Sequence, residues 1–168
     1  MPKKKISKPT KIKILSNQVT KLLDQAKVNY KVIKHKVVYT AHDAAQTTRK
    51  KLSEIAKVVL VKADKDLVLI VLPAGKYLDL GGIKKSLKAK KISIAKEKDI
   101  TIYLKTKIGL LHPFGSVYNI QTLMDKGLAK SKQLIASAGS YTDSVQLSVK
   151  DFEKLVKPIK GSFSKSKK

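Results

Sequence analysis

The chain has 168 residues, of which 42% are hydrophobic and only 5% aromatic, so it can build one core from Leu, Ile, Val and Ala. It has no cysteine, which excludes disulfides, zinc–thiolate sites and a cysteine nucleophile. A formal net charge of +25 predicts a polyanionic partner such as nucleic acid. The charge comes from 36 lysines and one arginine, which favours docking on phosphates over reading base edges. A general preference of the source organism for lysine is the alternative explanation.

Both ends of the chain are basic. Residues 1–13 carry six lysines and two prolines and predict a disordered basic arm, for which residues 159–168 form a matching basic tail. Residues 14–158 are expected to form a single domain. The longest apolar run, Leu67 to Leu72, is too short to cross a membrane, and no signal-peptide pattern follows the basic start. We therefore expect a soluble cytoplasmic protein, and nothing in the sequence indicates its oligomeric state.

The first half of the chain predicts two helices and a hairpin. Ser16 can cap a helix with apolar positions at Val19, Leu22, Leu23 and Ala26. A strand is expected over Tyr30 to Val38, and Thr40 to Asp43 has the spacing of a capping box for a helix that runs to about Lys50. Strands over Glu54 to Lys62 and Leu67 to Leu72, joined by a turn at 63–66, predict a hairpin.

A lysine cluster follows the break at Pro73, Ala74 and Gly75. Leu78, Leu80, Ile83 and Leu87 form one face of a short predicted helix, and five lysines lie on its other side and beyond it: Lys84, Lys85, Lys88, Lys90 and Lys91. This focused positive charge is a candidate surface for phosphate contacts. A helix face that is merely solvated is the equal alternative.

The rest of the chain predicts a mixed α+β fold. Strands are expected at Ile92 to Ala95, Val117 to Met124, Gln133 to Ser137 and Ser144 to Val149, and a last helix, capped by Ser148, at Phe152 to Val156. Ile100 to Ile108 fits either a strand or a helix that ends at Gly109. Without strict β–α alternation, we expect a mixed, largely antiparallel sheet that curls towards a barrel with surrounding helices.

Two positions stand out as candidates for chemistry. The stretch from Ile108 to Gly115 holds two glycines and a proline between hydrophobic runs, which favours a rigid ribbon whose main-chain groups face a ligand. A helix C-cap at Gly109 followed by an ordinary turn is the alternative. Lys57 enters a strand whose other residues are made for burial, so its side chain either lines a cavity or extends to the surface of the hairpin.

The order of these features resembles the YbaK and prolyl-tRNA synthetase-associated editing domain family. A segment with His35, Tyr39, Thr40 and Ala41 leads into an alanine-rich helix, and Ile55-Ala56-Lys57 precedes the hairpin. A Gly-x-x-x-Pro-Phe-Gly loop, a strand ending at Asp125 and the Ser137-Ala138-Gly139-Ser140 turn follow in order. The resemblance covers roughly residues 15–156, although valine follows Lys57 where many relatives carry a small polar residue.

This resemblance implies a trans-acting deacylase that hydrolyses the ester between a wrong amino acid and the terminal adenosine of a tRNA. Lys57 and Gly109 would then lie at the reacting ester. Substrate contacts would come from Tyr39, Thr40, Leu110, Leu111, His112, Pro113, Ser137 and Gly139, with His35 and Asp125 in support. The implied partners are the acceptor end of an aminoacyl-tRNA and, as a further candidate, a synthetase.

No cofactor or metal is expected. His35, His42 and His112 do not have a metal-ligand spacing, and no Gly-x-Ser-x-Gly elbow occurs. An aminoacyl ester is already activated, so a water or a ribose hydroxyl can attack it if the site supplies position and electrostatic field. The alternatives are a non-catalytic basic module that binds tRNA or other RNA, and a basic structural protein of a ribonucleoprotein.

Overall fold

The structure is a computed structural model and describes residues 18–166. Its strands are β1 (Tyr30–Lys34), β2 (Ala56–Ala63), β3 (Asp66–Pro73), β4 (Tyr77–Leu78), β5 (Ile92–Ile94), β6 (Gln121–Asp125), β7 (Gln133–Ser137), β8 (Asp143–Ser148), β9 (Ile159–Gly161) and β10 (Ser164–Lys165). Its helices are one over 18–25, α2 (Ala41–Thr48), α3 (Leu80–Leu87), α4 (Glu97–Asp99), α5 (Gly115–Tyr118), α6 (Lys126–Ala129) and α7 (Val149–Val156). A π-helical stretch, η1 (Ile100–Leu104), and a 3-10 turn, η2 (Ile108–Leu110), complete the elements.

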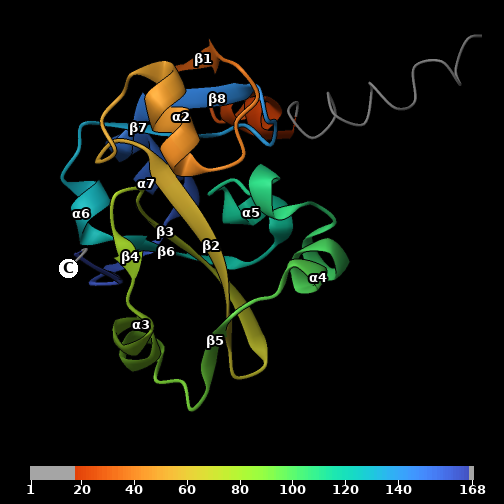
Figure 1. Cartoon of the computed structure of the whole chain (residues 1–168), viewed down its shortest axis with the longest axis vertical. Helices are drawn as coiled ribbons and strands as arrows, with labels where there is room; N and C mark the ends of the chain where they lie inside the picture. Colours follow the sequence, from red (N-terminus) through yellow and green to blue (C-terminus); the bar gives the residue numbers. More distant parts are fainter. Residues whose placement is uncertain (1–17, 167–168) are drawn as a thin grey trace, which may run out of the picture.

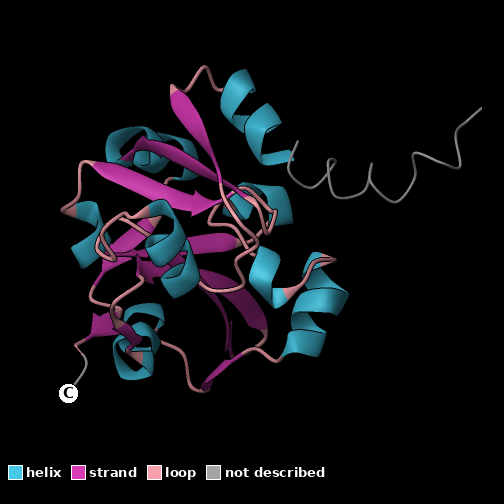
Figure 2. Cartoon of the chain, turned by 45° about the horizontal axis from the view of Figure 1, so that its top comes forward, coloured by secondary structure: helices cyan, strands magenta, loops and turns pink. Residues whose placement is uncertain are grey.

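Two sheets form the frame, as Figure 1 and Figure 2 show. One is three-stranded in the order β1-β8-β7, and the other is five-stranded in the order β5-β2-β3-β6-β9. A parallel bridge between Ile55 and Ile135 brings β7 to the start of β2, so the two sheets curl around a common interior. The expected α+β fold with a mixed, largely antiparallel sheet is confirmed, and within residues 18–166 the curl stops short of a closed barrel.

The hairpin of β2 and β3 is the centre of the fold and is confirmed. Its register runs from Ala56 opposite Pro73 to Ala63 opposite Asp66, and Asp64 takes the left-handed conformation that this tight turn requires, with φ 55°. β3 is buried on both faces, because the clusters on its two sides contain alternate residues of the strand. This burial fixes the position of β2, the strand that carries Lys57.

Two helix starts confirm the capping signals read from the sequence. The Thr40 hydroxyl accepts a hydrogen bond from the Asp43 amide at 3.0 Å at the start of α2, and Ser148 accepts one from the Asp151 amide at 3.0 Å at the start of α7. Ser16, the cap expected for the first helix, lies outside the described residues. The cap at Thr40 matters most, because it also fixes the segment that carries Tyr39.

The middle of the chain corrects two boundaries. Residues 97–104 are helical and end at Lys105, whose φ of 56° stops the helix before Gly109. The strand expected from Val117 begins only at Gln121, because residues 115–118 form a helical turn that Asn119 ends with φ 59°. The Gly109 stretch is therefore a separate segment between two helices.

The expected basic tail is part of the fold as far as Lys165. β9 pairs in parallel with β6, β10 pairs with β4, and Phe163 between them is fully buried. The domain therefore continues past the expected boundary at residue 158. The expected arm over 1–13 lies outside the described residues.

Candidate active site

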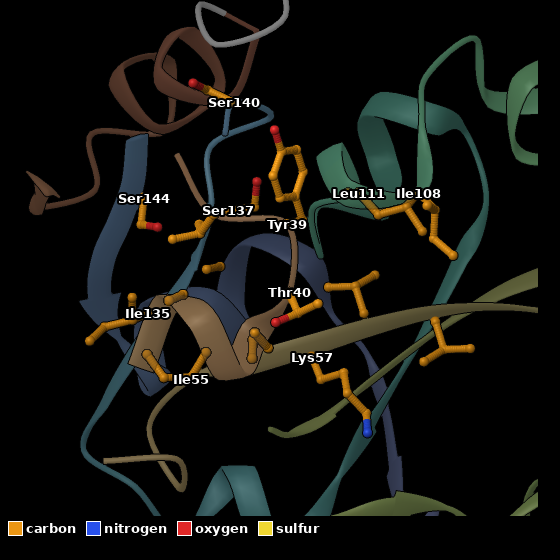
Figure 3. A pocket seen from close by; sticks show the side chains of 18 residues that line it. Tyr39, Thr40, Ile55, Lys57, Ile108, Leu111, Ile135, Ser137, Ser140 and Ser144 are labelled. Atoms are coloured by element: carbon orange, nitrogen blue, oxygen red, sulfur yellow. The ribbon is translucent and has the colours of Figure 1, made fainter. Parts of the chain in front are cut away.

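A pocket with a volume of about 480 Å³ opens between the two sheets, below the turn that precedes α2 (Figure 3). Strand β2, turn η2 and strands β7 and β8 supply its other walls. Of the predicted site residues it contains six: Tyr39, Thr40, Lys57, Gly109, Leu111 and Ser137. The structure thus brings the two central candidates, Lys57 and Gly109, into one cavity.

Lys57 lies in the pocket wall, half-buried, on β2. Its Nζ donates a hydrogen bond to the carbonyl oxygen of Lys76 at 2.8 Å and lies 5.9 Å from the centre of the Tyr77 ring. In Figure 3 this nitrogen points away from Ser137 and Ser140. The ammonium therefore stands at the edge of the pocket, next to β4.

Gly109 is the middle residue of η2, and close packing explains why this position is a glycine. A Cβ atom there would lie 2.9 Å from Cε1 of Tyr141 and 3.5 Å from the carbonyl oxygen of Tyr39. Gly109 does not have a positive φ that would require glycine. Among the glycines of the described chain, Gly139 has a positive φ, of 82°. The main chain at Gly109 is thus exposed to the cavity on one side and covered by an aromatic ring on the other.

The polar lining of the pocket is made of hydroxyl groups. Ser137, Ser140 and Ser144 face the cavity in addition to Thr40, and none of the described lining residues is Asp or Glu. Lys57 is the charged residue among them. A pocket with hydroxyls, main chain and one cation suits a substrate that carries or develops negative charge.

His35 holds one of these hydroxyls in place. Its Nδ1 lies 2.8 Å from the carbonyl oxygen of Lys36, and its Nε2 lies 2.9 Å from Oγ of Ser144. Because a carbonyl oxygen only accepts, Nδ1 must donate, and in the neutral ring Nε2 then accepts from Ser144. The supporting role of His35 stays a prediction, and Ser144 is a partner that sequence reasoning missed. No sequence spacing indicates this contact, because the two residues lie 109 positions apart.

Four predicted substrate contacts lie outside this pocket. Leu110, His112 and Gly139 line a neighbouring cavity of about 280 Å³, and Pro113 is buried. The loop alternates, so that Gly109 and Leu111 face the first cavity and Leu110 and His112 face the second. Two of the five residues of the Gly-x-x-x-Pro segment therefore reach the candidate active site.

His112 is a buried structural residue. Its ring stacks on Tyr118 with centroids 4.5 Å apart, and its Nδ1 accepts a hydrogen bond from the Phe114 amide at 3.3 Å. Burial lowers the pKa of His112 to about 3. The imidazole is therefore neutral near pH 7.

This burial predicts an acid-sensitive fold. In the unfolded chain His112 is protonated below about pH 6.5, whereas in the folded chain it stays neutral down to about pH 3. The free energy of unfolding therefore rises with pH across that window. We expect His112 to lower the free energy of unfolding by about 2 kcal/mol between pH 8 and pH 5. Urea denaturation at both pH values measures the change. His112→Gln should flatten the dependence, and an unchanged slope in that variant would contradict the assignment.

Asp125 ties the C-terminal strands to the fold, away from the pocket. It is only 4% exposed, and its two carboxylate oxygens accept hydrogen bonds from the amides of Gly127 and Phe163, each at 2.8 Å. Asp125 is the N-cap residue of α6 and does not line the pocket, so its support of the substrate stays a prediction. In these two hydrogen bonds the carboxylate of Asp125 is the acceptor for both main-chain amides.

Asp125→Ala is therefore expected to destabilise the fold. It leaves two amides without an acceptor, which costs about 3 kcal/mol in the free energy of unfolding. Asp125→Asn keeps one acceptor oxygen and should cost less. Urea denaturation compares the three proteins, and equal midpoints would show that the carboxylate does not anchor the C-terminal segment.

Within residues 18–166, no group of three or more His, Asp or Glu side chains is placed to hold a metal ion. No helix in the same range is long and apolar enough to span a bilayer.

Comparison with known proteins shows the family to which the chain belongs. The sequence profile of the aminoacyl-tRNA editing domain matches residues 35–155, which include both Lys57 and Gly109. This chain belongs to that family. Editing by such domains is hydrolysis of the ester of a mischarged tRNA, and the chain is accordingly an aminoacyl-tRNA deacylase.

Individual relatives support the same assignment. The prolyl-tRNA editing protein ProX of Acetoanaerobium sticklandii is 27% identical over 147 residues, which cover 84% of this chain and 90% of that protein. The crystal structure of a candidate trans-editing enzyme for prolyl tRNA synthetase superposes with a TM-score of 0.80 at 18% identity, over 90% of this chain and 98% of that one. A hypothetical protein, APE2540, gives the same TM-score at 18% identity, over 88% of this chain and 99% of that one. At these identities the two structures show the shared fold.

Proposed function

We propose that this editing domain acts in trans, and that the 480 Å³ pocket holds the aminoacyl ester of a mischarged tRNA between Lys57 and Gly109. The observation that carries the proposal is the meeting of these two residues, which lie 52 positions apart in the sequence, in one cavity without acidic lining residues. The amino acid enters the apolar interior, and the ribose of the terminal adenosine stays at the mouth.

Lys57 supplies positive charge for the reaction. Hydrolysis of an ester builds negative charge on the carbonyl oxygen, and a positioned ammonium stabilises it in a site that excludes water. Lysine has a long flexible side chain, so Nζ can exchange its hydrogen bond to Lys76 for one to the substrate. The Lys76 carbonyl then serves as the resting place of the ammonium between turnovers.

The remaining walls position the ester and the amino acid. The main chain at Gly109 approaches the ester without a side chain in the way, while Ser137 and Ser144 offer hydroxyl groups to the α-amino end. In the neutral state of His35, the Ser144 hydroxyl donates to the imidazole, so its oxygen is oriented as an acceptor. An α-ammonium group is a donor and fits that acceptor.

The identity of the tRNA follows from the relatives by analogy. ProX is named for prolyl-tRNA editing, and the superposed structure is described as acting for prolyl tRNA synthetase. We therefore propose that the substrate is tRNA that prolyl-tRNA synthetase has charged with a wrong amino acid. The reaction would take place in the cytoplasm, and that synthetase is a candidate partner.

Exposed lysines supply affinity for the tRNA backbone. The five lysines at Lys84, Lys85, Lys88, Lys90 and Lys91 are all exposed. Figure 1 shows α3, which carries the first two of them, at the end of the molecule away from β7 and β8. This surface can follow the tRNA while the acceptor end reaches the pocket, and such binding weakens steeply with salt.

Release of amino acid from mischarged tRNA tests the function. Wild-type protein is incubated with proline tRNA that has been mischarged with alanine, cysteine or serine. The amount of aminoacyl ester that remains is measured over time. We expect accelerated loss of at least one of the three esters. Salt-sensitive tRNA binding without release of any amino acid would favour the alternative, a non-catalytic RNA-binding module.

A further inference from the structure

Tyr39 is an unusual residue for the mouth of a pocket. Its side chain is 66% exposed, more than any other large hydrophobic side chain among residues 18–166. It nevertheless lines the pocket, and Figure 3 shows its ring standing above the cavity. An exposed aromatic ring beside a binding cavity is typical of a surface that a ligand covers.

A second ring fixes Tyr39 in position. The ring of Tyr141 lies 5.1 Å from that of Tyr39, centre to centre, with a tilt of 57°. Tyr141 is itself held from two sides, since its ring packs on Gly109 and its carbonyl oxygen accepts a hydrogen bond from the Val38 amide at 2.9 Å. The two rings thus form a platform that rests on the same main chain that lines the ester pocket.

Two exposed lysines lie close to the platform in the sequence. Lys36 and Lys107 are exposed and lie in the two segments that carry Tyr39 and Gly109. The carboxylate of Asp43 near the platform is engaged with the N-terminus of α2, where it accepts from the Tyr39 amide at 3.5 Å. Exposed aromatic rings with lysines beside them are the combination that binds unpaired bases of nucleic acids.

We propose that Tyr39 and Tyr141 form a stacking site for the unpaired purine base at the 3′ end of the tRNA. The proposal rests on the proposed function, because an ester held between Lys57 and Gly109 leaves the base one sugar away, at the mouth of the pocket. Stacking on an aromatic ring needs no base-specific hydrogen bonds, so the site accepts any purine and gains its selectivity from the attached ribose and phosphate.

Fluorescence of 2-aminopurine tests the stacking without any hydrolysis. The base is placed at the 3′ end of a short uncharged RNA that ends in CC-2-aminopurine, and its emission is followed as protein is added. Wild type and Tyr39→Phe should quench the emission. Tyr39→Ala should abolish the quenching and raise Kd about tenfold. Tyr103→Ala is the matched control, because Tyr103 is 60% exposed and lies outside the ester pocket.

The possible outcomes separate this proposal from the proposed function. Quenching by Tyr39→Ala equal to that of wild type overturns the stacking site, even if deacylation proceeds. Quenching that depends on Tyr39, in a protein that releases no amino acid, supports the stacking site and overturns the deacylase. Adenosine monophosphate that binds as tightly as the RNA, also through Tyr39, would overturn the assignment to an RNA end in favour of a free nucleotide.

Discussion

Lys57→Met is expected to lower kcat/KM for deacylation by about 100-fold or more. Methionine keeps most of the length of the side chain and removes the charge, so the pocket loses the cation that we place on the developing oxyanion. Loss of one such stabilising donor typically costs about 100- to 1,000-fold. Because Lys57 is only half-buried, the variant should fold, which circular dichroism and thermal unfolding check.

Lys62→Met is the matched control for Lys57. Lys62 lies on the same strand but outside the pocket, where its side chain is 45% exposed and its Nζ is 3.5 Å from a carboxylate oxygen of Asp99. The ammonium of Lys62 is in contact with solvent, and the buried Asp99 also accepts a hydrogen bond from the Lys96 amide at 2.9 Å, so deacylation should stay near wild type and stability should fall only slightly. Equal losses in the two variants would mean that the effect comes from general charge, and full activity in Lys57→Met would remove Lys57 from the mechanism.

Gly109→Ala is expected to lower deacylation about 10- to 100-fold with little loss of stability. The added methyl group would lie 2.9 Å from Cε1 of Tyr141, so either the ring or the η2 backbone must shift. A displacement of this size in a wall that positions the ester reduces the rate through lost alignment. Single-turnover kinetics measure the chemical step, and urea denaturation reports the fold.

Gly81→Ala controls for the general effect of removing a glycine. Among residues 18–166, its added Cβ would meet Asp79 Oδ1 at 3.5 Å, which is an ordinary contact at the start of α3. Alanine is the better helix former, so this variant should be as stable as wild type or slightly more, with unchanged deacylation. Unchanged deacylation in Gly109→Ala as well would show that η2 does not position the substrate.

Local chemistry made the hairpin and two helix starts predictable. The caps at Thr40 and Ser148 depend on residues within three positions of each other, and the β2–β3 turn closes over two residues. The C-terminal strands were missed because their partners are distant. β9 pairs with β6, and residues 159–165 contain lysines and serines that look like a solvated tail. Ile159 and Phe163 are the apolar residues of that stretch, and Phe163 is fully buried.

The candidate site was predictable as a set of motifs and less so as a geometry. The order of Lys57, the Gly109 loop and the Ser137 turn pointed to one pocket, which the structure contains. The sequence did not indicate which cavity each loop residue lines. In the structure His112 faces the second cavity and Leu111 faces the first. The hydrogen bond from Ser144 to His35 joins residues 109 positions apart, a distance over which no sequence spacing carries information.

A crystal structure with a stable analogue of the substrate tests the central claim most directly. In 3′-aminoacylamino-3′-deoxyadenosine an amide replaces the ester, so the ligand binds without being hydrolysed. We predict that its carbonyl lies between Lys57 and Gly109 in the 480 Å³ pocket, with Nζ of Lys57 moved from the Lys76 carbonyl to the ligand. An analogue bound elsewhere on the protein, with Lys57 still hydrogen-bonded to Lys76, would contradict the account.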